Sequence, residues 1–213
     1  MIPFSAEVYF SLFEDANLAQ WPAQLIAYGL AACIITLARK PSRFGDRLIP
    51  VILAAGWCWI GISFFDRVLS PVLWAAWIFK VAFLFQAVLF LATAFLPKPI
   101  PFHMHADNIG WTAGSLLVVG LLIYPVLAAQ LGHAWPLAQL LGVAPGPSVV
   151  FTIAVLSLAP GTMSRLLAVI PALSVLISAY VAWDLAIWED LLLALAGGVG
   201  LVGLYWVKAD KKT

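Results

Sequence analysis

The sequence predicts an all-α fold, an integral membrane bundle of seven transmembrane helices preceded by an amphipathic N-terminal helix. Three observations predict this class. Of the 213 residues, 64% are hydrophobic and 10% are charged, whereas a soluble domain is about half apolar and a quarter charged. The mean hydropathy is +1.03. The apolar residues form continuous runs of about 20 residues, as membrane helices require, and not the alternating pattern of a β-barrel.

The first element is a short amphipathic stretch, residues 4–14, which reads FSAEVYFSLFE. Its apolar and polar side chains fall on opposite faces of a helix. A helix of this length and pattern is typical of one that lies in the membrane interface. A disordered start of the chain is the alternative interpretation.

Seven candidate spans follow within a single transmembrane domain, residues 1–213. Their predicted bounds are about 20–38, 48–66, 72–96, 109–130, 142–159, 166–184 and 190–207. The fifth is short and interrupted by proline. Its unbroken part, SVVFTIAVLSLA, covers only about 18 Å as a helix, so it borrows residues from GVAPGP or is a re-entrant segment.

The basic residues predict the orientation, because Lys and Arg concentrate on the cytoplasmic side of membrane proteins. With seven spans and the loop ARKPSRFGDR inside, every Lys and Arg except Arg67 and Lys80 falls inside. We therefore expect a multi-pass protein of the bacterial inner membrane, with its N-terminus outside and its C-terminus in the cytoplasm. A net charge of +1 gives no reason to expect a nucleic-acid partner.

Lys80 is a charged residue within the third predicted span, where a lysine isolated in lipid costs about 2.5–3.5 kcal/mol. Its own helical face offers no hydrogen-bond partner, so we expect Asp184, or alternatively Asp66, to pair with it. Three interpretations stay open. Lys80 forms a structural ion pair or snorkels outward, it lines a polar cavity for an anionic ligand or protons, or it binds a chromophore through a Schiff base.

The stretch from 124 to 152 is the other candidate for a functional region. It holds Tyr124, Gln130, His133 and Gln139 among four prolines and has no Lys, Arg, Asp or Glu. Proline breaks helices, and irregular backbone within a membrane survives only where it is buried or faces water. The stretch therefore either dips into the bundle and lines a cavity or forms an ordinary outer loop.

Two further patterns are weaker. His103, His105 and Asp107 alternate in PKPIPFHMHAD, which would point them one way in an extended chain, but a metal site needs more ligands. Glycines at 110 and 114, and at 197, 200 and 203, predict close helix packing within one chain, in a homo-oligomer or against a membrane-complex partner.

Several segments together resemble a family of small bacterial polytopic membrane proteins that is defined as a domain of unknown function. They are NLAQWPAQ (17–24), GWCWIG (56–61), FLFQAVLF (83–90), YPVLAAQLGHAWP (124–136), GVAPGPSVVFT (142–152), and IP followed by WED (170–190). The resemblance implies a membrane fold and no particular activity. The family pattern has a cysteine in place of Gly146 and a small residue in place of Lys80. The residues that match its motifs are Asn17, Trp21, Pro22, Gln24, Gln86, Tyr124, Pro125, Gly132, His133, Pro136 and Thr152.

These observations lead to one principal function and two alternatives. We expect a non-enzymatic protein without a cofactor that binds or passes a small molecule or an ion through an outward-facing polar pocket. The predicted pocket residues are Lys80, Gln86, Tyr124 and His133, with Asp66 or Asp184. The alternatives are an accessory or scaffold subunit of a larger membrane complex and a chromophore-binding protein with its Schiff base at Lys80.

Overall fold

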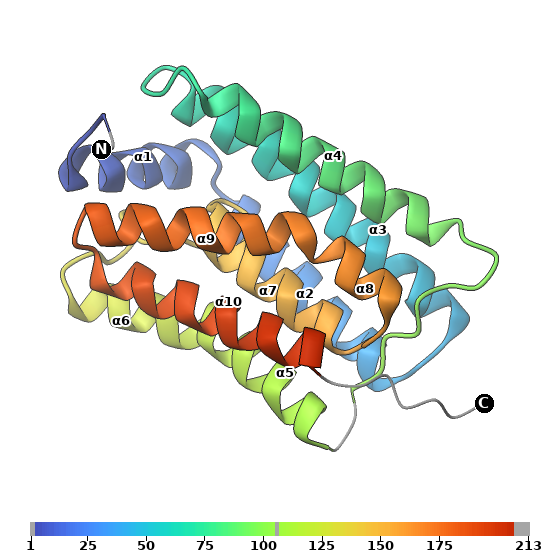
Figure 1. Cartoon of the computed structure of the whole chain (residues 1–213). Coiled ribbons are helices and arrows are strands. Elements are labelled where there is room, and N and C mark those ends of the chain that lie inside the picture. Colours follow the sequence, from blue (N-terminus) through green and yellow to red (C-terminus); the bar gives the residue numbers. More distant parts are fainter. Residues whose placement is uncertain (1–2, 105–106, 207–213) are drawn as a thin grey trace.

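The computed structural model describes residues 3–104 and 107–206, and its helices pack side by side as a bundle (Figure 1). Every regular element in this described part is helical, as the sequence predicts. The hydrophobic core joins side chains from both ends of the chain, from Leu12 to Leu204. The apolar runs of the sequence thus bury one face against each other.

The N-terminal helix α1, Ala6–Ala19, begins at Ser5, whose hydroxyl accepts a hydrogen bond from the Val8 amide. Serine is a favoured N-cap residue because it satisfies one of the orphan amides of the first turn. The next helix, α2 (Ala23–Arg39), leaves α1 at an angle of 85°. The α1 helix therefore lies across one end of the bundle, while α2 runs along it (Figure 1).

A long helical hairpin follows. The α3 helix, Arg43–Ile60, is capped by Ser42 and continues as a π-helical segment, η1, over Gly61–Leu69. After a short turn the chain returns as α4, Ala76–Ala94. Trp57 packs against Phe83 and Phe90 of α4, so large aromatic side chains fill the seam between the two helices.

The middle of the chain builds the centre of the bundle. The α5 helix, Asn108–Val118, continues through a π-helical segment, η2 (Val119–Ile123), into α6, Tyr124–Gln130. A loop then leads to α7, Pro145–Ser157, in which every residue from Pro147 onward is buried. A helix that is apolar all round belongs in the interior, and α7 lies behind α9 and α10 in Figure 1.

The last three helices complete the bundle. The α8 helix, Thr162–Leu167, runs almost directly into α9, Val169–Asp184. The final helix, α10, spans Trp188–Trp206 and packs against α9 and α7. Gly197 and Gly200 of α10 face Val175, Leu116 and Ile153 at distances that leave no room for a side chain. These two glycines therefore allow close helix packing, as predicted, through contacts within this chain.

Each predicted span contains a helix, but the helices differ in length. In the part of the chain that the structure describes, five are long and apolar enough to cross a membrane: Arg43–Leu69, Ala76–Ala94, Gly110–Gln130, Thr162–Asp184 and Trp188–Trp206. The bent pair of α1 and α2 makes a sixth if it counts as one span. The α7 helix is shorter than the predicted fifth span because residues 142–144 and 158–159 stay outside the helix.

Basic residues gather mainly at one end of the bundle and acidic residues mainly at the other, although Asp46 and Asp107 lie among the basic residues and Arg67 and Lys80 among the acidic ones. One end, which we term the basic end, joins the end of α2, the starts of α3 and α8, and the segment after α4. It carries Arg39, Lys40, Arg43, Arg47, Lys98 and Arg165. The opposite end, termed the acid end, holds α1, the η1–α4 turn and the α9–α10 turn (Figure 1), with Glu7, Glu14, Asp15, Asp66, Asp184, Glu189 and Asp190.

Candidate functional site

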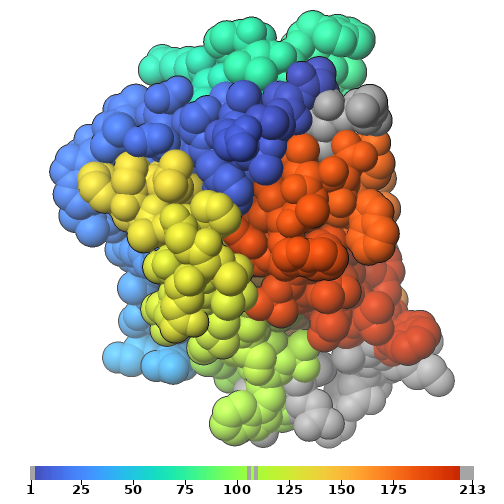
Figure 2. Space-filling view, turned by 90° about the vertical axis from the view of Figure 1, so that its left-hand side faces the viewer, coloured from blue at the N-terminus to red at the C-terminus, as the bar shows by residue number. Residues whose placement is uncertain are grey.

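A cluster of polar side chains lies buried at the acid end, where parts of the chain that are distant in sequence meet. Figure 2 looks onto this end and shows α1, the loop after α6 and the α9–α10 region in contact. The cluster, termed here the carboxylate cluster, is built around two consecutive acids at the start of α10. Its members are Tyr9, Tyr124, His133, Gln139, Glu189 and Asp190.

Asp190 is the centre of the cluster, and only 3% of its surface is exposed. The Tyr9 hydroxyl donates to its Oδ2 at 2.6 Å, and the Tyr124 hydroxyl donates to its Oδ1 at 2.6 Å. Gln139 Nε2 donates to Oδ2 at 2.7 Å. Three donors therefore converge on the two oxygens of one carboxyl group, which holds Tyr9, Tyr124 and Gln139 together.

Glu189 is 4% exposed and turns toward the loop after α6. His133 Nδ1 lies 2.6 Å from Glu189 Oε1, and the imidazole stacks on the Phe10 ring with the centroids 3.6 Å apart. The His133 side chain is 29% exposed, so it forms the boundary between the buried acids and the surface.

The position of the two acids at a helix start explains how they tolerate burial. Glu189 and Asp190 occupy the first turn of α10, where unpaired amides and the helix dipole favour negative charge. Burying a charge otherwise costs several kcal/mol. The helix terminus, two phenols, an amide and an imidazole together offset this cost.

The loop that carries His133 and Gln139 is fixed by the N-terminal helices. Asn17 Nδ2 donates to the carbonyl oxygens of Pro136 and Ala138 at 2.7 and 2.8 Å. Gln24 Nε2 in turn donates to the Asn17 carbonyl oxygen at 2.8 Å. Two segments that carry the family resemblance, 17–24 and 124–136, therefore meet, and their amides hold the loop against the bundle.

A small cavity adjoins Asp190. Its volume is ≈ 20 Å³, and it is lined by Gln139, Gly146, Asp190, Ser178 of α9 and apolar side chains of α7, α9 and α10. About 10–15 Å³ suffices for one water, so the cavity admits a water but no organic molecule. Gly146 borders this space closely, because a methyl group there would lie 2.7 Å from Gln139 Oε1.

The arrangement can bind, hold or relay a proton. A His–Glu pair with one shared hydrogen bond can carry a proton on either partner. The adjacent Asp190 carboxyl borders the water-sized cavity. Across the described residues, no group of three His, Cys, Asp or Glu side chains is arranged to hold a metal ion.

The structure brings together only part of the predicted pocket. Tyr124 and His133 lie in the carboxylate cluster through their bonds to Asp190 and Glu189. Gln86 is fully buried elsewhere, and its Nε2 donates to the Leu167 carbonyl oxygen at 3.0 Å. Asp184 is exposed at the end of α9.

The preferred partner for Lys80 was wrong. Lys80 Nζ lies 2.8 Å from Asp66 Oδ1, not from Asp184. The turn between η1 and α4 places these two residues on adjacent antiparallel segments. Their side chains are 33% and 44% exposed, so the pair is not deeply buried. This openness favours the ion-pair interpretation of Lys80 over an enclosed Schiff base.

The candidate metal ligands fall on the other end of the molecule. Asp107 Oδ1 accepts a hydrogen bond from the Gly110 amide, and His103 donates its backbone amide to the Leu158 carbonyl oxygen. His105 lies outside the described residues. The alternating pattern therefore stays a sequence prediction.

Sequence reasoning missed the centre of the cluster. Glu189 and Asp190 looked like ordinary acids at a membrane surface, and Tyr9 lies 181 residues from its partner Asp190. The segment WED, which is part of the family resemblance, was the available signal. Two acids at the start of a predicted span are a common helix start, so their presence alone did not distinguish them.

Comparison with known proteins gives one match. The family model described as "Family of unknown function (DUF6064)" matches residues 6–213. No curated protein and no solved structure matches the chain.

Proposed function

This chain belongs to DUF6064, a family of unknown function. We propose that it is a multi-pass inner-membrane protein that binds an ion at an outward-facing polar site. The site is the carboxylate cluster, and the ion is a proton. The N-terminus lies outside and the C-terminus lies in the cytoplasm.

The observation that carries the proposal is the pair of buried consecutive acids, in which Glu189 is hydrogen-bonded to His133 and Asp190 borders a water-sized cavity. The cavity is too small for an organic ligand, which favours an ion over the small molecule of the sequence-based expectation. Two acids face one imidazole here, so the site favours a positive charge. His133 connects the pair to the surface, which gives a proton an entry point.

Charge placement supports the orientation. The basic end carries Arg39, Lys40, Arg43 and Arg47, and such residues concentrate on the cytoplasmic side. The cluster lies at the opposite end and therefore faces outward. In this arrangement α1 lies in the outer interface and α7 is a short central span enclosed by the others.

Infrared difference spectroscopy on the protein in liposomes tests proton binding directly. The sample is acidified from about pH 8 to about pH 5, the range in which an imidazole changes charge. We expect a carboxyl or imidazole protonation band from the cluster that is lost in His133→Gln and in Glu189→Gln. The matched control is Asp15→Asn, which changes an exposed acid of α1 and should leave the band unchanged.

Two results would overturn the proposal. One is a wild-type spectrum without any protonation band. The other is a band that survives both His133→Gln and Glu189→Gln, because it would then arise elsewhere. An intact far-UV circular dichroism spectrum of each variant shows that a lost band does not reflect unfolding.

A groove between α9 and α10 supports the scaffold alternative. It is lined by Gly198 and by apolar residues that include Leu176, Leu195 and Val202, and it lies on the outer surface of the bundle. Small residues permit close approach of a second helix in a membrane. Native mass spectrometry of protein extracted in mild detergent tests this function. A partner or second copy that is lost in Gly198→Leu would support it, and a monomer alone would contradict it.

A further inference from the structure

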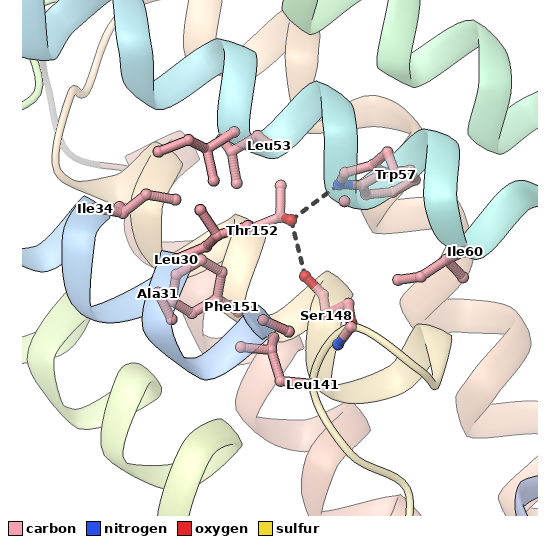
Figure 3. A pocket seen from close by; sticks show the side chains of 14 residues that line it. Leu30, Ala31, Ile34, Leu53, Trp57, Ile60, Leu141, Ser148, Phe151 and Thr152 are labelled. Atoms are coloured by element: carbon pink, nitrogen blue, oxygen red, sulfur yellow. Dashed lines mark hydrogen bonds between the residues drawn. The ribbon is translucent and has the colours of Figure 1, made fainter. Parts of the chain in front are cut away.

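A second cavity lies on the side of the bundle, away from the carboxylate cluster. It is a groove between α2, α3 and α7, and Figure 3 shows side chains of all three helices pointing into it. The groove contains ≈ 70 Å³ that the centre of a water-sized sphere can occupy, against ≈ 20 Å³ for the cavity at Asp190, and ≈ 450 Å³ of space free of protein atoms when its open mouth is included. Along α2 it extends from Ala27 to Ile34, about 10 Å at helical rise.

The lining is almost entirely apolar. Leu30, Ile34, Leu53 and Ile60 form much of the wall. A methyl group added at Gly56 of α3 would meet no other atom within 4 Å. The absence of a side chain at Gly56 therefore leaves part of the groove open.

The few polar groups at the floor already have protein partners. Trp57 Nε1 donates to Thr152 Oγ1 at 3.0 Å, and Thr152 Oγ1 donates to the Ser148 carbonyl oxygen at 2.8 Å (Figure 3). Ser148 Oγ donates to the Ala144 carbonyl oxygen and accepts from the Gly142 amide. The indole and hydroxyl hydrogens are all donated within the protein, so a polar ligand would find no free donor among these groups, which favours a hydrocarbon occupant.

The groove opens on a face that the bilayer covers. Of its own lining, Leu30 of α2 is 38% exposed, and Ile52 and Gly56 of α3 are half-buried. In a membrane-spanning chain such apolar residues contact lipid tails. We propose that this groove holds one acyl chain of a membrane phospholipid. The inference depends on the membrane location and not on proton binding at the carboxylate cluster.

Trp57 reports on the occupant, because its ring lines the groove. The protein is placed in nanodiscs of phosphatidylcholine that carries bromine in the middle of one acyl chain. The fluorescence of Trp57 is obtained as the difference between the wild type and Trp57→Phe. Bromine quenches indole over a short range, so we expect this difference to shrink at least twofold relative to unbrominated lipid.

Two leucine substitutions distinguish a seated chain from surrounding lipid. Gly56→Leu fills the groove and should restore the Trp57 signal. Gly29→Leu makes the same change on an exposed part of α2 that does not line the groove, and it should leave the quenching as in the wild type. Equal quenching in both leucine variants would overturn the proposal.

Native mass spectrometry adds a readout that needs no variant. After extensive detergent washing, the wild type should retain one phospholipid per chain. Gly29→Leu should retain it as well, and Gly56→Leu should lose it. Wild-type protein without bound lipid, or with an isoprenoid quinone in its place, would refute the assignment to a phospholipid.

Discussion

Single residues at the acid end serve different purposes, although their charges look alike in the sequence. Glu189 and Asp190 are almost fully buried and hydrogen-bonded, whereas Asp66 is close to half exposed beside Lys80. The free energy of an ion pair depends strongly on this difference, since exposed pairs contribute little and buried ones require their partners. The residues therefore differ in their expected response to substitution.

Lys80 and Asp66 form the exposed case. We expect Lys80→Met and Asp66→Asn each to change the free energy of unfolding by less than about 1 kcal/mol, with a coupling of about 0.2–1 kcal/mol between them. Thermal unfolding in detergent of both single variants and the double variant measures this coupling. The matched pair Lys80→Met with Asp184→Asn should be additive. A loss of several kcal/mol in Lys80→Met alone would contradict the expectation.

Asn17 forms the buried case. Its amide nitrogen donates to two loop carbonyl oxygens, at 2.7 and 2.8 Å, and the side chain is fully buried. Asn17→Asp replaces the donor with an acceptor of the same shape, so both carbonyl oxygens lose their partner. At about 1–3 kcal/mol for each unsatisfied group, we expect at least about 2 kcal/mol of destabilisation.

The unfolding temperature in detergent at neutral pH measures the effect of Asn17→Asp. Gln130→Glu is the control, because it makes the same amide-to-acid change on an exposed residue at the end of α6. Equal shifts in the two variants would show that added negative charge, and not the lost bonds to the loop, destabilises the protein.

Among the helices, α10 shows how glycine sets packing distance. A methyl group at Gly200 would lie 2.6 Å from Leu116 Cδ1 and 2.8 Å from Ile153 Cγ2, and Ile153 is buried in the central helix. Overpacking a filled core typically costs about 1–3 kcal/mol. We expect Gly200→Ala to destabilise the protein by an amount in this range.

The neighbouring Gly198 provides the control on the same helix. A methyl group there would meet no atom within 4 Å. Because alanine favours helix by about 1 kcal/mol over glycine, Gly198→Ala should be neutral or stabilising. Unfolding in detergent compares the two variants. Similar destabilisation in both would point to a general cost of losing glycine and not to the contact with α5 and α7.

The helices were predictable because each depends on a local signal. A continuous apolar run predicts a helix without knowledge of its neighbours, and α3, α4 and α9 all lie where such runs do. The end of a helix is less certain, as at α7, where residues 142–144 are apolar yet lie outside the helix. Both glycines of α10 that pack closely also follow from sequence.

The carboxylate cluster was only partly predictable because it depends on long-range contacts. Tyr124 and His133 were recognised by their place in a proline-rich stretch. Tyr9 was assigned to the apolar face of an interfacial helix, yet its hydroxyl reaches Asp190 on the last helix. Its ring does pack on Phe13. No periodicity within α1 encodes the polar contact, since the partner lies at the opposite end of the chain.

At the scale of the whole molecule, the two charged ends define the expected orientation in the membrane. The proposed seven crossings require that the short α7 crosses with its neighbours, although it has only 13 residues, about 20 Å as a helix. Its burial on all sides makes this possible, because the surrounding helices and not lipid cover its ends. The path of the chain fits this, since α6 ends at the acid end and α8 begins at the basic end.

Cysteine accessibility and end reporters test this topology. With a membrane-impermeant thiol reagent applied to intact cells, we expect labelling at Gln130→Cys, which is exposed at the acid end, and none at Thr162→Cys, which is exposed at the basic end. Inverted membrane vesicles should reverse the result, which controls for intrinsic reactivity.

Reporter fusions should place the N-terminus outside and the C-terminus inside. If the reporters placed both ends on the same side, the chain would have one crossing fewer, and α7 would then be re-entrant. Labelling of Thr162→Cys in intact cells would instead indicate the opposite orientation. The carboxylate cluster would then face the cytoplasm, which contradicts an outward-facing site.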